Sequence, residues 1–425
     1  MGTRIGRRRL GAFAATSAAL AGCAGAGAAK GRVVVVGGGF GGATAARKVR
    51  EFDPAIDVTL IEPSATFITC PFSNYVLAGF KTMADITHRY DDFAAKYGVN
   101  FVPDTVVAID AAAKTVRTQG GSSFAYDRLI VSPGIDLRWG AIPGYDEAAA
   151  ERMPHAWKAG PQTTLLRDQL RAMPDGGVVI LSVPANPFRC PPGPYERTAM
   201  IAHYLKREKP RSKILVLDAK DAFSKQALFQ DGWKALYGEM IEWVPLSKDG
   251  KVVQAIPGEM TLVSEFGVRH RGAVVNVVGP QWAGRIARDS GLAAESGWCP
   301  VNPTTFESTR VKDVHVIGDA CIAGAMPKSG FAANSQGKVA ALAVVDAING
   351  RPSAAPTYVN TCYSLLAPDY GITVADVYRV GPEGIAPVQG AGGVSPRNAD
   401  AAFRAAEARY AEGWYAAMSL EIWGN

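Results

Sequence analysis

The chain carries six cysteines, and two of them, Cys190 and Cys362, occur in surroundings that favour sulfur chemistry. Cys190 lies in Phe-Arg-Cys-Pro-Pro-Gly-Pro and Cys362 in Asn-Thr-Cys-Tyr. We expect both to lie in irregular segments, where a rigid scaffold presents functional groups. A thiolate opens a disulfide by ordinary exchange, and the opened disulfide has accepted two electrons. Both cysteines are therefore candidates for redox chemistry, although a purely structural disulfide role fits the same residues.

A glycine-rich turn near the start of the chain has the pattern of a dinucleotide-binding loop. A β-branched run over 32–36 predicts a buried parallel strand, 43–50 predicts a helix, and a strand over 58–61 runs into Glu62. The turn after the first strand contains Gly37, Gly39, Phe40 and Gly42. Such glycines let the backbone approach a pyrophosphate at a helix N-terminus, and the acid accepts a hydrogen bond from a ribose hydroxyl. A tight turn without a ligand is the alternative.

Two later segments complete an expected FAD site. Residues 126–134 form a short apolar strand that enters a turn at Gly134, and residues 309–319 end in Gly318 and Asp319. Both resemble motifs of flavoproteins that contain two dinucleotide domains. In those motifs the Asp carboxylate bonds the ribityl chain of the cofactor.

An insertion between these segments resembles a second Rossmann unit without a nucleotide loop. Strands are expected over 177–182 and 213–218, but the loop after the first strand contains several prolines and has no glycine before Gly193. Proline lacks an N–H donor, so this loop offers no nest for a pyrophosphate. We therefore expect that NAD(P)H does not bind there, an unusual nucleotide loop being the alternative.

The N-terminal 29 residues read as an export signal rather than as part of the fold. Three consecutive arginines at 7–9 precede a short apolar stretch over 10–21, which is typical of a signal of the twin-arginine type. Cleavage near Ala29 and lipid attachment at Cys23 are competing predictions, and a disordered tail is the third. Loss of this segment removes four arginines and no acid, so the formal charge falls from +6 to +2. That charge is too small for a nucleic-acid-binding protein.

These patterns predict an α/β protein with two Rossmann-like dinucleotide-binding domains of the FAD disulfide reductase type and a C-terminal α+β segment. The expected boundaries are an export signal over 1–29, a split FAD domain over 31–150 and 270–345, a second Rossmann-like domain over 151–269, and a C-terminal active-site segment over 346–425. No segment is long and apolar enough for a transmembrane helix, and the five histidines show no metal-ligand spacing.

Four motifs together resemble the flavoprotein subunit of flavocytochrome c sulfide dehydrogenase, a family related to sulfide:quinone oxidoreductases. They lie at 69–74, 188–196, 326–338 and 360–371. The resemblance implies a periplasmic enzyme that oxidises sulfide to persulfide or polysulfide and passes electrons to a c-type cytochrome subunit. The chain itself has no Cys-x-x-Cys-His motif, so haem c would belong to that partner.

The resemblance also implies roles for individual residues. Cys190 and Cys362 match a redox-active disulfide, and Glu196 matches an active-site acid or base. Cys70 matches the cysteine that carries FAD through a covalent thioether, although Pro71 replaces the tyrosine of the family pattern. The remaining matches are Lys328 and Gly330, at a helix start expected to face the flavin, and Trp414, an aromatic residue near it.

Two other classes remain open at this point. A sulfide:quinone oxidoreductase should carry a basic, tryptophan-rich amphipathic anchor at its C-terminus, whereas acids punctuate the helix expected over 401–425. A non-catalytic FAD-containing binding or assembly subunit should show degraded FAD motifs, and these motifs are intact.

Overall fold

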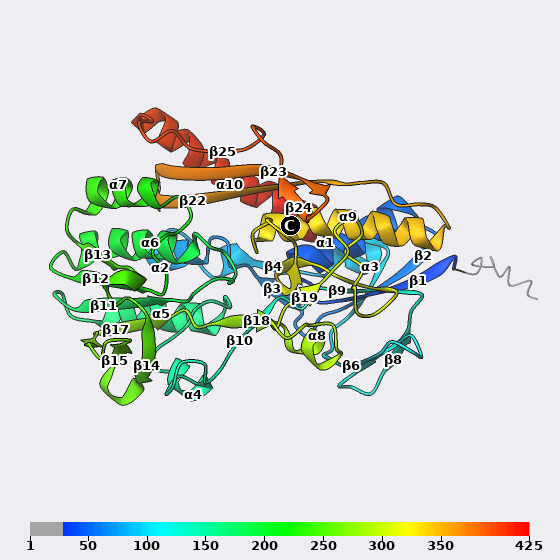
Figure 1. The fold of residues 1–425 in the computed structure, drawn as a ribbon, viewed down its shortest axis with the longest axis horizontal. Helices are drawn as coiled ribbons and strands as arrows, with labels where there is room; N and C mark the ends of the chain where they lie inside the picture. The colour runs from blue at the N-terminus through cyan, green and yellow to red at the C-terminus, as the bar shows by residue number, and fades with distance from the viewer. Residues whose placement is uncertain (1–28, 425) are drawn as a thin grey trace, which may run out of the picture.

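The computed structural model describes residues 29–424 (Figure 1). The predicted export signal, with the candidate lipid site Cys23, lies outside the described residues apart from its last position. No helix within residues 29–424 is both long and apolar enough to cross a bilayer.

A five-stranded parallel sheet forms one half of the molecule, with strand order β20-β9-β1-β2-β5. Its strands are β1 (Gly31–Val36), β2 (Ile56–Ile61), β5 (Val99–Val102), β9 (Arg128–Val131) and β20 (Val314–Val316). The central strand β1 is almost wholly apolar and buried, as expected for a strand covered on both faces. Helices α1 (Phe40–Phe52) and α9 (Gly330–Ile348) pack against each other above it (Figure 1).

A four-stranded parallel sheet forms the other half, with strand order β13-β12-β11-β17. Its strands are β11 (Val178–Val183), β12 (Lys213–Asp218), β13 (Ile241–Val244) and β17 (Val274–Val277), with helices α5 (Pro161–Ala172), α6 (Gly193–Glu208) and α7 (Gln226–Tyr237). An antiparallel pair, β10 (Ile135–Leu137) and β18 (Gln281–Ala283), connects the halves where the chain crosses between them. The predicted α/β class with two Rossmann-like units is therefore confirmed.

Shorter helices and strands complete the two halves. They are β3 (Thr66–Ile68), α2 (Ser73–Ala78), β4 (Thr87–Arg89), α3 (Asp92–Tyr97), β6 (Val106–Asp110), β7 (Thr115–Thr118), β8 (Ser123–Ala125), α4 (Glu147–Ala150), β14 (Val252–Ile256), β15 (Thr261–Ser264), β16 (Arg269–Arg271), α8 (Arg285–Asp289), β19 (Cys299–Pro300) and β21 (Cys321–Ile322), with short 3-10 turns such as Gly318–Ala320.

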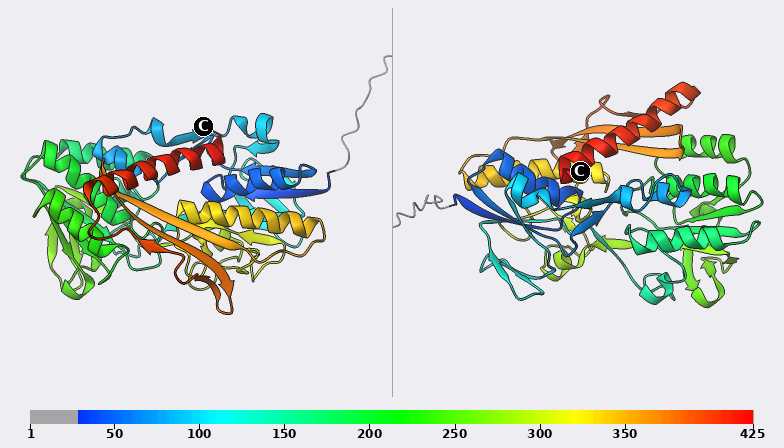
Figure 2. Two further views of the ribbon diagram at one scale, coloured as in Figure 1. Left: turned by 90° about the horizontal axis from the view of Figure 1, so that it is seen from above. Right: turned by 180° about the vertical axis from the view of Figure 1, so that it is seen from behind.

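The C-terminal segment lies across both halves. Its long antiparallel hairpin, β22 (Thr357–Ala367) and β23 (Tyr370–Gly381), is extended by β24 (Gly384–Pro387) and β25 (Gly393–Val394) and followed by α10 (Ala401–Trp423). Strand β22 contacts α6 of one half and α9 of the other. Figure 2 shows the hairpin running beside α9 and helix α10 returning to α1.

The last turn of α10 anchors this segment to the glycine-rich turn. Trp423 is fully buried, stacks on Phe67 and His88, and meets the edge of Phe40. Its indole Nε1 donates to the Gly38 carbonyl at 3.4 Å. The end of the chain thus supports the turn between β1 and α1.

Replacing this anchor tests its contribution to stability. We expect Trp423→Ala to lower the free energy of unfolding by about 3–5 kcal/mol, because a buried aromatic side chain is lost and a cavity remains. Leu420→Ala on the same helix, where the side chain is 60% exposed, should change it by no more than about 0.5 kcal/mol. Denaturant unfolding measures both, and equal losses would contradict the proposed anchoring.

Candidate active site

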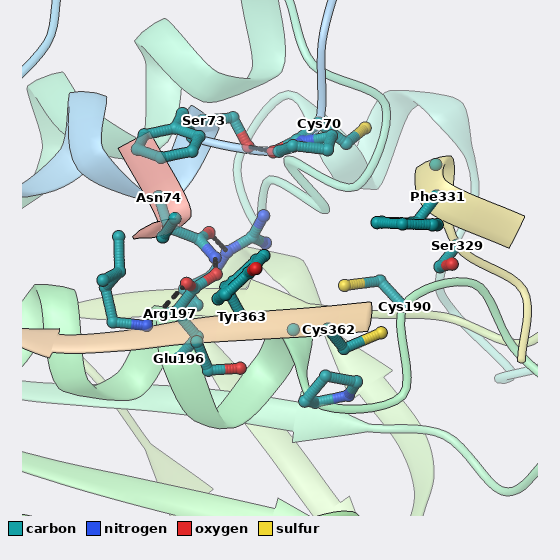
Figure 3. Close-up of a pocket in the computed structure, with 18 of the residues that line it drawn as sticks. Cys70, Ser73, Asn74, Cys190, Glu196, Arg197, Ser329, Phe331, Cys362 and Tyr363 are labelled. Carbon is teal, nitrogen blue, oxygen red and sulfur yellow. Dashed lines mark hydrogen bonds between the residues drawn. The ribbon is translucent and has the colours of Figure 1, made fainter. Parts of the chain in front are cut away.

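One pocket brings together the cysteines that the sequence singled out. Cys70, Cys190 and Cys362 all line it, together with Glu196 and Trp414. These residues come from the loop before α2, the loop after β11, strand β22, helix α6 and helix α10. Figure 3 shows Cys190 and Cys362 on neighbouring segments, with Cys70 entering from another side of the pocket.

Cys190 sits at a tight turn that holds its backbone in place. Its φ is 57°, an uncommon conformation for a residue other than glycine. Its N–H donates to the Lys328 carbonyl at 2.7 Å, and its own carbonyl accepts from the Gly193 N–H at 2.8 Å. A Cβ at Gly193 would lie 2.8 Å from both the Cys190 sulfur and the Trp157 ring. Glycine at 193 therefore leaves room for the thiol.

Cys362 lies inside β22, so the expectation of an irregular segment was wrong for this residue. The alternating β-branched and aromatic residues around it favour a strand. Asn360 donates from Nδ2 to the Cys362 sulfur at 3.4 Å and accepts from the Ser329 hydroxyl at 2.6 Å. Ser329 caps α9 by accepting from the Ala332 N–H at 3.0 Å. These hydrogen bonds fix the position of β22 relative to the start of α9.

All five cysteines within residues 29–424 are free thiols in this structure. Burial raises the pKa of Cys190, and a charge on Cys362 would raise it further. Burial also raises the pKa of Cys362, opposed mainly by the Lys225 ammonium. Two thiolates side by side in this pocket are therefore disfavoured, which suits a pair stored either protonated or joined.

Glu196, in the first turn of α6, holds its carboxylate at the same pocket. It accepts from Asn74 Nδ2 at 2.8 Å and from the Leu365 N–H at 2.9 Å. Burial raises the pKa of Glu196 despite these hydrogen bonds and the nearby Lys225 and Arg197 charges. A carboxyl group whose pKa is raised can exchange a proton closer to neutral pH.

Arg197 organises the wall behind Glu196, and sequence reasoning missed it. Its buried guanidinium donates to Asn74 Oδ1 at 3.0 Å, to the His155 carbonyl at 3.0 Å and to the Ala156 carbonyl at 2.6 Å. Burial lowers its pKa to about 10. A charged residue in an otherwise apolar stretch of helix, directly after Glu196, was the available signal.

Cys70 faces the carbonyl of Trp157. Its thiol donates to that oxygen at 3.2 Å, and its own carbonyl accepts from the Ser73 hydroxyl at 2.7 Å. The Arg189 guanidinium donates to the same Trp157 carbonyl. The Cys70 sulfur thus lies at the pocket, close to the loop that carries Cys190.

The predicted dinucleotide-binding residues form a second group, beside β1 and β20. Glu62 Oε2 accepts from the Gly38 N–H at 2.8 Å. A Cβ at Gly37 would collide with the Ser132 carbonyl and one at Gly42 with the Gly37 carbonyl, so both positions require glycine. Gly39 precedes α1, Phe40 opens it, and Gly134 adopts a φ of 64°.

A further observation shows that this group of residues fits FAD. Asp319 Oδ1 is buried and has no hydrogen-bond partner among the described residues, and burial raises the pKa of this carboxyl. An orphaned buried acceptor is costly, and a ribityl hydroxyl is the donor that the FAD motif supplies. Gly318, beside it, is held by Gln336, whose Oε1 accepts its N–H at 2.8 Å.

The region expected to face the flavin differs in detail from the prediction. Helix α9 begins at Gly330, after the Ser329 cap. The Lys328 ammonium donates to the carbonyls of Asp319 at 2.7 Å and Cys321 at 2.8 Å, so it lies along the Asp319 turn rather than in the pocket lining. Trp414 stacks with Phe331 at the pocket, their ring centroids 6.1 Å apart.

In the second Rossmann unit, the acid at the strand end where a nucleotide ribose would bind is hydrogen-bonded to protein groups instead. Asp218, at the end of β12, is fully buried. It accepts from the Tyr195 hydroxyl at 2.6 Å, from Lys220 Nζ at 2.6 Å and from Trp243 Nε1 at 3.0 Å. A carboxylate with three protein donors has little capacity left for a nucleotide ribose. This arrangement agrees with the absence of glycines in the preceding loop.

Three family models match the chain. One described as "Sulfide dehydrogenase [flavocytochrome c] flavoprotein chain, central" matches residues 163–279, and one described as "Flavocytochrome c sulphide dehydrogenase, flavin-binding" matches 354–423. A third, "Pyridine nucleotide-disulphide oxidoreductase", matches 31–168.

Individual proteins agree with these matches. The flavocytochrome c sulfide dehydrogenase flavoprotein chain of Chlorobaculum thiosulfatiphilum is 67% identical over 45 residues, which are 11% of this chain and 94% of that sequence. The mitochondrial sulfide:quinone oxidoreductase of Mus musculus is 23% identical over 305 residues, 68% of this chain and 65% of that one. This chain spans between 40% and 65% of the length of three related sulfide:quinone oxidoreductases, those of Mus musculus, Dictyostelium discoideum and Aquifex aeolicus.

A solved structure shows the same fold. The sulfide:quinone oxidoreductase of the hyperthermophilic bacterium Aquifex aeolicus superposes with a TM-score of 0.69 at 17% identity, and 92% of each chain is covered.

The pocket wall also predicts a pH dependence of stability. Burial, with the Arg197 charge, lowers the pKa of His155 to about 3 from an ordinary 6.5. Below about pH 6.5 the unfolded chain binds a proton that the folded chain refuses, so stability falls as the pH drops from there towards 3. His155 Nδ1 accepts from the Trp157 N–H at 2.9 Å, and an Asn oxygen can replace it.

We therefore expect His155→Asn to lose less stability than wild type on acidification. Between about pH 6.5 and about pH 4.5 the difference should reach about 2 kcal/mol, since each pKa unit corresponds to about 1.4 kcal/mol. Urea unfolding across this range measures it. Parallel profiles for the two proteins would contradict a buried, neutral His155.

Proposed function

The chain belongs to the family of flavocytochrome c sulfide dehydrogenase flavoprotein chains, and on that premise we propose that it oxidises sulfide through a Cys190–Cys362 disulfide and FAD. The convergence of these two distant cysteines in one pocket carries the proposal. The expected products are persulfide or short polysulfide sulfur, and the enzyme would be a sulfide–cytochrome c oxidoreductase.

The chemistry begins at the disulfide. Hydrosulfide attacks one of its sulfurs, a new sulfur–sulfur bond forms, and the Cys190–Cys362 bond breaks. One cysteine becomes a persulfide, and the other leaves as a thiolate that carries the electron pair.

Glu196 is proposed to manage the protons of this step. Its raised pKa and its place on the pocket wall suit exchange of a proton with incoming sulfide or the departing persulfide. Asn74 and the Leu365 N–H fix the orientation of the carboxylate.

FAD supplies a carrier that takes electrons as a pair and returns them one at a time. The residues proposed to hold it are the glycine-rich turn, Glu62, Gly134 and the Gly318-Asp319 turn, with Lys328, Gly330 and Trp414 near its reactive end. We propose that Cys70 is joined to it covalently. A divided FAD domain over 31–150 and 270–345 follows from the same assignment.

We further propose a c-type cytochrome subunit as electron acceptor and a periplasmic location reached by twin-arginine export. The matched Chlorobaculum thiosulfatiphilum protein is named as the flavoprotein chain of a flavocytochrome c. A sulfide:quinone oxidoreductase is the second candidate, favoured by the similarity to the mouse and Aquifex proteins. Copurification of a haem c protein, as opposed to quinone reduction by the isolated chain, separates the two.

The disulfide assignment predicts the behaviour of two variants. Cys190→Ser and Cys362→Ser should each slow flavin reduction by sulfide at least 10²-fold per bound flavin, on the order of 3 kcal/mol, because no disulfide remains for hydrosulfide to attack. Cys299→Ser, which alters a buried thiol outside the pocket, is the matched control. Stopped-flow absorbance measures the rates, and wild-type rates in either pocket variant would refute the assignment.

In the same assay NADH and NADPH should leave the wild-type flavin oxidised, because the loop after β11 lacks glycines and Asp218 is occupied by protein donors. Rapid bleaching by NADH would show that the second Rossmann unit binds a nucleotide after all.

The Cys70 linkage predicts a flavin that stays with the denatured chain. After acid precipitation, wild type should retain flavin fluorescence on the polypeptide, whereas Cys70→Ala should release its FAD. Full release from the wild type would exclude the thioether while leaving the sulfide chemistry open.

A further inference from the structure

Lys225 is a buried lysine that the sequence analysis did not single out. It immediately precedes α7, its φ is 60°, and it is 9% exposed. A left-handed conformation is uncommon for a long side chain, and a buried ammonium is costly. A position that combines both features calls for a specific cause.

The ammonium is directed at the strand that carries Cys362. Lys225 Nζ donates to the Cys362 carbonyl at 2.8 Å, to the Ser364 hydroxyl at 2.8 Å and to the Ile372 carbonyl at 3.3 Å. All three protons of the ammonium therefore have partners, which fixes the position of the charge.

Every one of these partners is neutral. No carboxylate within residues 29–424 forms an ion pair with Lys225. The acids that act on it from a distance are Glu196 and Glu407. Glu196 is engaged by Asn74 and Leu365, and Glu407 accepts from Ser395 at 2.5 Å and Arg404 at 3.4 Å. The positive charge is thus left without a directly bonded anion in the resting protein.

We infer that Lys225 is a positioning residue whose charge stabilises a thiolate at Cys362 when the disulfide opens. This role rests on the proposed function. The missing anion appears only when the Cys190–Cys362 bond breaks, so the interaction is stronger in the opened state than in the resting state. The free-energy cost of burying the Lys225 ammonium is then offset by its attraction to the negative charge that develops on Cys362.

Other charged and titratable groups near Cys362 and Lys225 also affect the stability of a thiolate at Cys362. Around Cys362 they are Cys190, Glu196, Lys225 and Tyr378; around Lys225 they are Cys190, Cys362, Glu196 and Glu407. The carboxylates and the second thiol oppose an anion at Cys362. Lys225 is the cation among these groups, and its pKa, lowered by burial to about 8, keeps it charged at neutral pH.

Thiol labelling tests the inference without any sulfide. The FAD-loaded holoenzyme is reduced anaerobically with dithiothreitol, pulsed with iodoacetamide across about pH 6–10, and the Cys362 peptide is quantified by mass spectrometry. Because the thiolate is the reacting form, Lys225→Met should slow labelling of Cys362 about tenfold at neutral pH, one pKa unit. Cys190, which Lys225 does not contact directly, should change less.

Two further variants complete the design. Lys225→Gln keeps hydrogen-bond donors but loses the charge, so it should match Lys225→Met; a wild-type profile in Lys225→Gln would overturn the charge role. Lys234→Met removes an exposed lysine of α7 and should leave the profile unchanged. An unchanged Cys362 profile in both Lys225 variants, with circular dichroism showing a folded protein, would also refute the inference. If Lys225→Met slows Cys362 labelling as expected but the wild-type flavin is not reduced by sulfide, the result would instead count against the proposed function.

Discussion

Two hydrogen bonds hold strand β22 between the starts of two helices, and the candidate active site depends on them. The Leu365 N–H donates to Glu196 at 2.9 Å in the first turn of α6, and the Ser329 hydroxyl that caps α9 donates to Asn360 at 2.6 Å. Cys362 lies between these two attachment points. Because α6 follows the Cys190 loop and α9 follows the Lys328 carbonyl that binds Cys190, the same contacts place both thiols.

The charges of the pocket are arranged around this strand. Arg197 supports Asn74, Asn74 supports Glu196, and Glu196 holds β22 by its backbone. Lys225, directly before α7, contacts the same strand and donates only to neutral groups. A pocket in which burial raises the pKa of both thiols and of the nearby carboxyl favours neutral species at rest. A negative charge that develops on Cys362 has the Lys225 ammonium fixed close to it.

The fold could be predicted because it depends on local patterns. The glycine turn, the strands and Glu62 are contiguous signals in the sequence. The loop without glycines after β11 supports only the prediction that the second unit binds no nucleotide. The position of Cys362 within a strand was mispredicted because its Asn and Tyr neighbours read locally as a loop. Long-range pairing with β23 decides the outcome there. Lys225 and Arg197 lie far in sequence from the groups they contact, so only the tertiary structure identifies them.

The central claim is that Cys190 and Cys362 form the disulfide that receives sulfide sulfur, and non-reducing peptide mapping tests it most directly. In the oxidised protein the account predicts a linked Cys190–Cys362 peptide pair. After anaerobic addition of one equivalent of sulfide it predicts that the pair is lost and that one of the two peptides carries an additional sulfur atom. Free thiols at both positions in the oxidised protein, or a linked pair that sulfide leaves intact, would contradict the account.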